Sequence, residues 1–249
     1  MKKYILEVCT DSVEASCTAS RCGANRLELC SNLILGGTTP GTCLFQAVRK
    51  YCSTKINVLI RPRYGDFCYT DYEFEMLKEE VKLFRALGAD GIVTGILKPD
   101  GNLNIEQMEE ILSLADNVPV TLHRAFDVCA DPYRTLEEAK RLGIRTILTS
   151  GQKNTCIDGV FLLKELIEKS AGEVDILVGG GVSAKIIPKL REATRATSYH
   201  MSGKRVEDSA MLYRKEDISM GLPSFSEYQI FRADEEEILR AVNTLQHLA

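Results

Sequence analysis

The sequence lacks any apolar run long enough to cross a membrane. Its first twelve residues, "MKKYILEVCTDS", begin with basic residues, but the apolar stretch that follows is short and is interrupted by Glu7. A secretory signal needs a longer apolar core, and a membrane-spanning helix needs about 20 apolar residues. We therefore expect a protein that is neither exported nor inserted into a membrane, and we place it in the cytoplasm.

An excess of basic residues is also lacking. The chain has 31 Lys and Arg residues against 35 Asp and Glu residues, which gives a formal net charge of −4. Proteins that bind nucleic acids or membrane surfaces usually carry a positive excess. We therefore expect neither a nucleic acid nor a membrane as a partner.

The nine cysteines lack the spacing of a zinc site, because no two of them form a C-x-x-C pair. Their odd number, in a chain of this size without a secretory signal, also disfavours a disulfide framework. We expect reduced thiols in a reducing cytoplasm, most of them packed as small buried hydrophobic side chains.

Short strand-like runs alternate with helical patterns along the whole chain. The runs cover residues 4–9, 26–30, 56–63, 91–96, 119–126, 145–151, 174–181 and 197–204. Such alternation predicts a parallel sheet with helical crossovers. The alternative, an open doubly wound sheet, normally has a G-x-G-x-x-G turn after its first strand, and "EVCTDS" has none. Because a closed barrel needs about 250 residues, we predict an α/β fold, with residues 1–249 forming a single (β/α)8 TIM-barrel domain.

One segment interrupts this alternation. Residues 205–233, between the last expected strand and the last expected helix, show no clean period. Long irregular connections in compact domains are usually lids, binding loops or subunit contacts. We therefore expect an irregular loop region here, before the last helix.

Polar side chains recur at alternate positions near the ends of five strands. Alternate positions share one face of a strand, and the sets are Glu7 with Cys9, Arg26 with Glu28 and Cys30, Leu59 with Arg61 and Arg63, Thr121 with His123, and Ser198 with His200. The outer face of a barrel strand packs on helices, so these sets should point inward, near the C-terminal mouth where barrel enzymes place their sites. A single Glu–Arg pair or a lone histidine would fit a structural core. Several inward charges exceed what packing needs, because each is costly unless paired.

The charges of this set favour an anionic ligand. The arginines Arg26, Arg61 and Arg63 outnumber the two glutamates. Two glycine-containing turns add candidate backbone N–H donors, at positions where barrels often hold phosphate. They are "LTSGQ" with Ser150 and Gly151, and "LVGGGVSA", which we expect to open a helix, with Gly180 and Gly181.

The histidines indicate a candidate catalytic function for the same site. His123 and His200 would carry out acid–base catalysis, oriented by Glu7 and Glu28. Apart from Lys204 the strand ends lack lysine, which disfavours Schiff-base chemistry. This reading predicts an isomerase or lyase that acts on a phosphorylated or carboxylated small molecule.

Cys9 and Cys30 end the first two strands in the matching phrases "LEVC" and "LELC". Because adjacent strands lie about 4.8 Å apart, the two sulfurs can lie close together at one depth. Soft thiolates favour Cu(I), and neighbouring arginines would lower the thiol pKa values. The spacing alone equally fits two inert, buried thiols.

Longer motifs resemble the CutC family of copper homeostasis proteins. They are "LEVC", "GANRLELCSNLILGGTTP", "IRPRYGDFCYTDYE", "LHRAFD", "ILTSGQ", "GGGV" and "HMS" followed by "SAMLYR", and the match runs from about residue 4 to residue 228. This resemblance implies a cytoplasmic TIM barrel, usually a homo-oligomer, that binds copper. By the same resemblance, Cys9 and Cys30 would be the Cu(I) ligands.

Three functions remain open from the sequence. The first is copper handling, as the resemblance implies, and the second is an enzyme for a small anionic substrate. The third is a scaffolding protein whose contacts come from residues 205–233.

Overall fold

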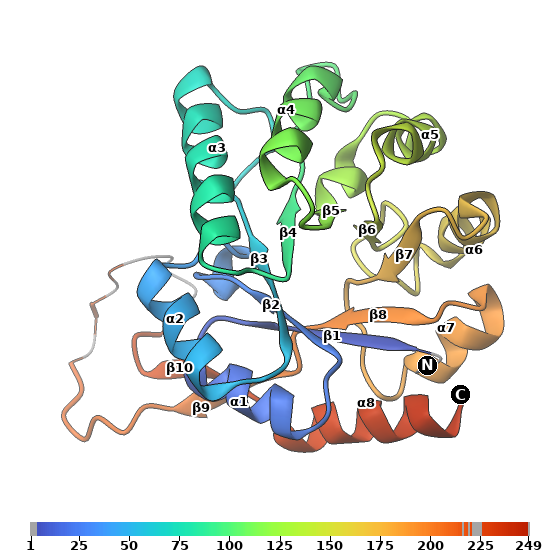
Figure 1. The fold of residues 1–249 in the computed structure, drawn as a ribbon. Coiled ribbons are helices and arrows are strands. Elements are labelled where there is room, and N and C mark those ends of the chain that lie inside the picture. Colours follow the sequence, from blue (N-terminus) through green and yellow to red (C-terminus); the bar gives the residue numbers. More distant parts are fainter. Residues whose placement is uncertain (1–3, 216, 219, 221–225, 249) are drawn as a thin grey trace.

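Eight parallel strands form a closed barrel in which β1 pairs with both β2 and β8 (Figure 1). The computed structural model describes residues 4–215, 217, 218, 220 and 226–248. The barrel strands are β1 (Ile5–Thr10), β2 (Arg26–Leu29), β3 (Lys55–Leu59), β4 (Gly91–Thr94), β5 (Val120–Leu122), β6 (Thr146–Thr149), β7 (Asp175–Val178) and β8 (Ser198–Met201). The closed barrel confirms the expected fold class, and the alternative of an open doubly wound sheet is wrong.

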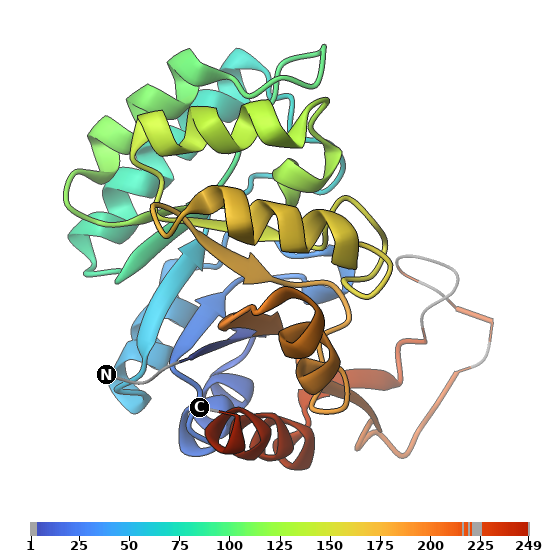
Figure 2. The same cartoon turned by 90° about the vertical axis from the view of Figure 1, so that its right-hand side faces the viewer.

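A helix follows nearly every strand and covers the outside of the barrel (Figures 1 and 2). The helices are α1 (Val13–Arg21), α2 (Thr42–Tyr51), α3 (Asp71–Ala86), α4 (Ile105–Ala115), α5 (Pro132–Leu142), α6 (Val160–Ser170), α7 (Ile187–Thr194) and α8 (Glu235–His247). Two short 3-10 helices, η1 (Leu33–Leu35) and η2 (Arg124–Val128), lie in the loops after β2 and β5. Among the described residues, no helix combines the length and the apolar character needed to cross a membrane.

Local signals explain where several helices begin and end. The Ser12 side chain accepts a hydrogen bond from the backbone N–H of Ala15 and so caps α1. Thr70 and Glu73 form a reciprocal capping box at the start of α3. Gly143 ends α5 with a φ of 75°, a left-handed conformation that favours glycine.

The strands divide their side chains between two hydrophobic clusters. Leu6, Val8 and Leu27 belong to the large cluster that packs the barrel against its helices. A small cluster consists of Cys9, Cys30, Leu59 and Val93, with Leu33 packed against it. The alternation along β1 and β2 therefore separates an apolar outer face from an inner face that carries thiols and charges.

The third strand is shorter than the sequence suggested. It ends at Leu59, so Arg61 and Arg63 lie in the loop before α3. The expectation that Leu59, Arg61 and Arg63 share one strand face is therefore wrong. Pro62 supplies the reason, since proline has no backbone N–H to donate to a neighbouring strand.

The segment 205–233 is less irregular than expected. Strands β9 (Lys204–Asp208) and β10 (Gln229–Ala233) pair antiparallel at its two ends. The described residues between them reach away from the barrel (Figures 1 and 2) and include Leu212, whose side chain is fully exposed. Residues 216, 219 and 221–225 of this segment lie outside the described part of the chain.

Candidate functional site

A cavity of about 460 Å³ opens at the C-terminal ends of the barrel strands. Its volume falls in the range typical of sites for small molecules. One wall carries Cys9, Glu28 and His200, and another carries Arg61, His123 and Arg124. Both histidines expected at the barrel mouth thus border one cavity.

Cys9 of β1, which borders the cavity, lies beside the fully buried Cys30, which directly follows β2. The Sγ atoms of Cys9 and Cys30 lie 3.7 Å apart, which confirms their expected proximity. The Cys9 thiol also donates to Oε1 of Glu28 over 3.4 Å. Ligand atoms of Cys9, Glu28 and His200 lie within 4.8 Å of one another and form a candidate metal-binding group.

The ionisation of Cys9 differs from the sequence expectation. Its hydrogen bond with Cys30, together with burial, raises the pKa of the Cys9 thiol well above its ordinary value. Glu28 adds to this rise in pKa through its charge. The expectation that arginines lower the pKa of this thiol is therefore wrong, because its immediate neighbours are another thiol and a carboxyl group.

Glu7 lies fully buried beneath this wall and holds His200. Its Oε1 lies 2.8 Å from Nδ1 of His200, and its Oε2 pairs with Nε of Arg26. Burial alone would raise the pKa of Glu7, but the charge of Arg26 and the contact with His200 outweigh it and lower the pKa to about 2. Burial would lower the pKa of His200, yet Glu28, Cys9 and Glu7 together raise that pKa well above its ordinary value.

Two of the three arginines expected at the mouth lie elsewhere. Arg26 begins β2 at the position paired with Glu7, beneath the cavity. Arg63 lies outside the cavity and pairs with Asp66 at 2.9 Å and with Glu73 at 2.6 Å. The expected cationic excess of three arginines at the mouth is therefore wrong, because carboxylates already neutralise both of these residues.

Arg61 is the predicted arginine that does border the cavity, and its side chain is held by backbone carbonyls. Its terminal nitrogens donate to the carbonyl oxygens of Gly36, Gly37 and Gly65 over 2.8–3.3 Å. Arg61 is only 8% exposed, and no carboxylate among the described residues lies within 4.0 Å of its guanidinium group. Its Nε also has no partner in this part of the chain.

His123 caps the short helix η2. Its Nδ1 accepts a hydrogen bond from the backbone N–H of Ala125 over 3.2 Å, and the residue is only 4% exposed. Because a backbone N–H can only donate, this Nδ1 is unprotonated and Nε2 carries the proton. Burial, with a contribution from the charge of Arg61, lowers the pKa of His123 to about 3.

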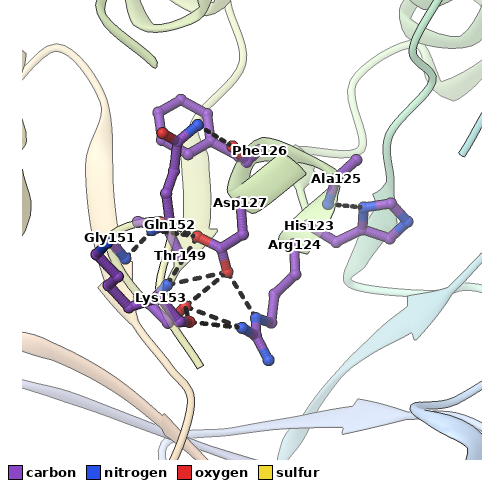
Figure 3. Close-up of polar contacts among 10 residues, drawn as sticks. His123, Arg124, Ala125, Phe126, Asp127, Thr149, Gly151, Gln152 and Lys153 are labelled. Carbon is purple, nitrogen blue, oxygen red and sulfur yellow. Dashed lines mark hydrogen bonds and ion pairs between the residues drawn. The ribbon is translucent and has the colours of Figure 1, made fainter. Parts of the chain in front are cut away.

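Asp127 connects the loops that follow β5 and β6 (Figure 3). Its carboxylate accepts hydrogen bonds from Nε of Arg124, from the Thr149 hydroxyl and from the backbone N–H groups of Ser150 and Gln152. The motifs "LHRAFD" and "LTSGQ" are therefore two halves of one structural unit, which we call the Asp127 clamp (Arg124, Asp127, Thr149, Ser150 and Gln152).

In the clamp, two expected anion-binding positions already have hydrogen-bond partners. The clamp also contains a residue at the cavity that was not predicted from the sequence. The N–H of Ser150 donates to Asp127, and the N–H of Gly151 donates to the Thr149 hydroxyl, so both donors are already used. Arg124, which borders the cavity, was not among the predicted site residues. Its position one residue after His123, and three before Asp127, was the signal available in the sequence.

The glycine turn after β7 also borders the cavity. Gly180 and Gly181 have φ values of 87° and 80°, which favour glycine. A Cβ atom at Gly180 would lie 2.8 Å from Cβ of Ser150. Helix α7 begins only at Ile187, so the expectation that these glycines open the helix directly is wrong.

Comparisons with known proteins identify relatives over most of the chain. The model of the CutC family matches residues 4–205. The copper homeostasis protein cutC homolog of Mus musculus is 39% identical over 243 residues, which cover 97% of this chain and 89% of the relative. A family protein CutC from Bacteroides fragilis strain YCH46 is 41% identical over 231 residues, which cover 92% of each chain.

Comparison with solved structures also finds a CutC protein. A CutC structure from Streptococcus agalactiae superposes with a TM-score of 0.76 and 29% identity, covering 80% of this chain and 98% of that one. A phosphoribosylanthranilate isomerase from Thermotoga maritima reaches a TM-score of 0.57 at 10% identity, covering 98% of this chain and 99% of that one. The second likeness shows a shared fold alone.

The low pKa of His123 predicts a loss of stability in acid. Below a pH of about 6.5 the unfolded chain protonates this histidine, whereas the folded protein does so only near pH 3. At pH 5 this difference lowers the free energy of unfolding by about 2 kcal/mol relative to pH 7. Urea denaturation of the wild type and of His123→Asn, which keeps a capping acceptor, measures the effect. Equal pH dependence in the two proteins would contradict it.

The Asp127 clamp predicts a large effect of a nearly isosteric change. Asp127→Asn replaces a carboxylate oxygen by an amide N–H that faces donors, so we expect a loss of about 2–3 kcal/mol in unfolding free energy. Asp66→Asn is the matched control, because its exposed ion pair with Arg63 contributes less than about 1 kcal/mol. Denaturation curves that show similar losses for both variants would refute the importance of the clamp.

Proposed function

Since the chain belongs to the CutC family, we propose that it binds Cu(I) as its cargo at the wall of the barrel cavity that carries Cys9. Cys9 and Cys30 are the proposed ligands, and His200 is a third candidate. The observation that carries the proposal is the 3.7 Å separation of the two sulfur atoms, of which the one on Cys9 borders the cavity. A site of two thiols and an imidazole suits a soft monovalent copper ion.

The orientation of His200 supports the same proposal. Glu7 engages Nδ1 of His200, which leaves Nε2 as the nitrogen available to a metal. A carboxylate that fixes the second nitrogen of a histidine is a common arrangement around metal ligands. Arg26 in turn pairs with Glu7, so the carboxylate stays ionised below the site.

The surroundings of the thiols determine the free-energy cost of binding Cu(I), because protons must be displaced. The raised pKa values of Cys9 and His200 mean that both hold protons near neutral pH. A bound ion must displace these protons, so binding is coupled to proton release. The carboxyl groups of Glu7 and Glu28 give the entering cation a local negative environment that compensates part of this cost.

The proposal also covers the cellular location of the protein and its oligomeric state. The cytoplasm is the proposed location, because its reducing conditions keep both thiols free. We propose that the chain forms a homo-oligomer through the segment between β9 and β10, where Met211, Leu212 and Tyr213 expose large apolar side chains. A scaffolding function would use the same segment without needing the cavity.

An enzymatic function is the second candidate, and the size of the cavity favours it. A volume of about 460 Å³ far exceeds the space of one ion and suits a phosphorylated or carboxylated small molecule. In this reading an isomerase or lyase would use His200 with Glu7 and Glu28 for proton transfer. His123 would act as a neutral hydrogen-bond donor through Nε2–H, since its low pKa prevents the ring from taking up a second proton at neutral pH.

The anion-binding residues of this second function follow from their positions. Arg61, Gly180 and Gly181 border the cavity and are proposed to contact the substrate. The remaining predicted positions have other partners and would act indirectly; they are Arg26, Arg63, Ser150 and Gly151.

Anaerobic titration with Cu(I) against a competing chelator tests the copper site. We expect the variant Cys9→Ser/Cys30→Ser to bind at least about 100-fold more weakly, because hydroxyls replace both soft ligands. Cys17→Ser/Cys52→Ser is a matched control, since these two sulfurs lie 3.4 Å apart outside the barrel cavity. Unchanged affinity in the first variant, or an equal loss in the control, would remove the proposed site.

The same titration at several pH values tests the coupling to protons. We expect the affinity for Cu(I) to rise with pH between 6 and 8, by about tenfold per unit for each proton released. His200→Gln should reduce this slope, because one proton fewer is displaced. An affinity independent of pH in the wild type would contradict the proposed ligands.

A further inference from the structure

We propose that the cavity holds the oxyanion of a small organic ligand between the guanidinium group of Arg61 and Nε2–H of His123. The ligand class is a carboxylate or a phosphate monoester. This inference rests on the second function proposed above and names the group that its substrate must carry. It does not depend on whether Cu(I) binds at Cys9 and Cys30.

The first support is the charge of Arg61. A buried cation is costly unless an anion lies beside it, and a salt bridge to Glu7 compensates the partly buried Arg26. Arg61 instead donates to three neutral backbone carbonyls, and the described residues place no carboxylate within reach of it. The positive charge at this wall of the cavity is therefore uncompensated.

The second support is the unsatisfied donor on His123. The contact between Nδ1 and Ala125 leaves the proton on Nε2, and this nitrogen has no partner in the part of the chain that the structure describes. Buried polar groups in folded proteins nearly always find a partner. A ligand oxygen that accepts from Nε2–H would satisfy it.

The two groups belong to the same wall. The guanidinium carbon of Arg61 lies 5.0 Å from the ring centre of Phe67, and the ring of His123 lies 4.7 Å from that same ring centre. Phe67 therefore packs against both groups. The charge of Arg61 contributes to lowering the pKa of His123, which is consistent with this proximity.

The other residues that line the cavity indicate which chemical features the remainder of the ligand should have. Apolar side chains, including Leu33, Leu59 and Leu148, line the space next to the proposed oxyanion. Arg124 contributes a second cation at the cavity, but Asp127 neutralises it. One oxyanion on a short carbon skeleton therefore fits better than a polyanion, and its far end would face Cys9 and His200.

Thermal unfolding with simple anions tests the inference. Inorganic phosphate and propionate serve as the phosphate and carboxylate probes, with potassium chloride at matched ionic strength as the reference salt. At an anion concentration of about ten times Kd, we expect Tm to rise by about 3 °C with at least one probe. The probe that gives the larger rise identifies the oxyanion class, and no rise with either probe would overturn the inference.

Three variants test where in the protein the anion binds. His123→Asn keeps an acceptor for Ala125 but removes the distal N–H, and Arg61→Gln removes the charge; each should weaken binding of the active probe at least about tenfold. Arg240→Gln is the control, because Arg240 lies on α8 away from the residues that line the cavity, and it should bind as the wild type does. If Arg61→Gln does not fold, His123→Asn alone decides.

The outcomes separate this inference from the copper proposal. Wild-type affinity for the probe in His123→Asn would overturn the oxyanion site, whatever Cu(I) does. Loss of Cu(I) binding in Cys9→Ser/Cys30→Ser, with anion binding retained, would support two distinct subsites in one cavity. Loss of anion binding in that same cysteine variant would overturn the placement at Arg61 and His123.

Discussion

The buried carboxylate of Glu7 is the interaction on which the interior of the barrel depends. It contacts Arg26 on β2 and His200 on β8, and the Asn57 side chain on β3 lies 3.4 Å from it. These strands include both neighbours of β1 around the closed barrel. A carboxylate with such partners stays ionised at any ordinary pH, so it fixes both the position and the charge of the histidine above it.

The cavity combines two kinds of chemistry in its lining. One wall carries sulfur, a carboxyl group and an imidazole held by Glu7. The other carries a guanidinium without a carboxylate partner in the described chain, and a neutral imidazole that donates. The two histidines, similar in the sequence, therefore have opposite properties, because one lies among carboxylates and the other beside an arginine.

Much of this arrangement follows from the sequence alone. The alternation of runs predicts the closed barrel, and the period of two along "LEVC" and "LELC" places both cysteines inside it. The positions of the Arg61 and Arg63 side chains could not be predicted in the same way. Pro62 ends the strand, so contacts within the following loop determine where these side chains lie. Asp127 shows the same limit, since its donors other than Arg124 lie more than twenty residues away in the sequence.

The loops at the rim of the barrel differ in the contacts that hold them. The Asp127 clamp ties the loops after β5 and β6 together, and Arg61 joins its own loop to the carbonyls of residues 36 and 37. On the remaining side, Ser202 borders the cavity only two residues before β9 begins its excursion into solvent. The Asp127 clamp and Arg61 therefore brace the loops after β3, β5 and β6, whereas the chain after β8 leaves the barrel through the exposed strand β9.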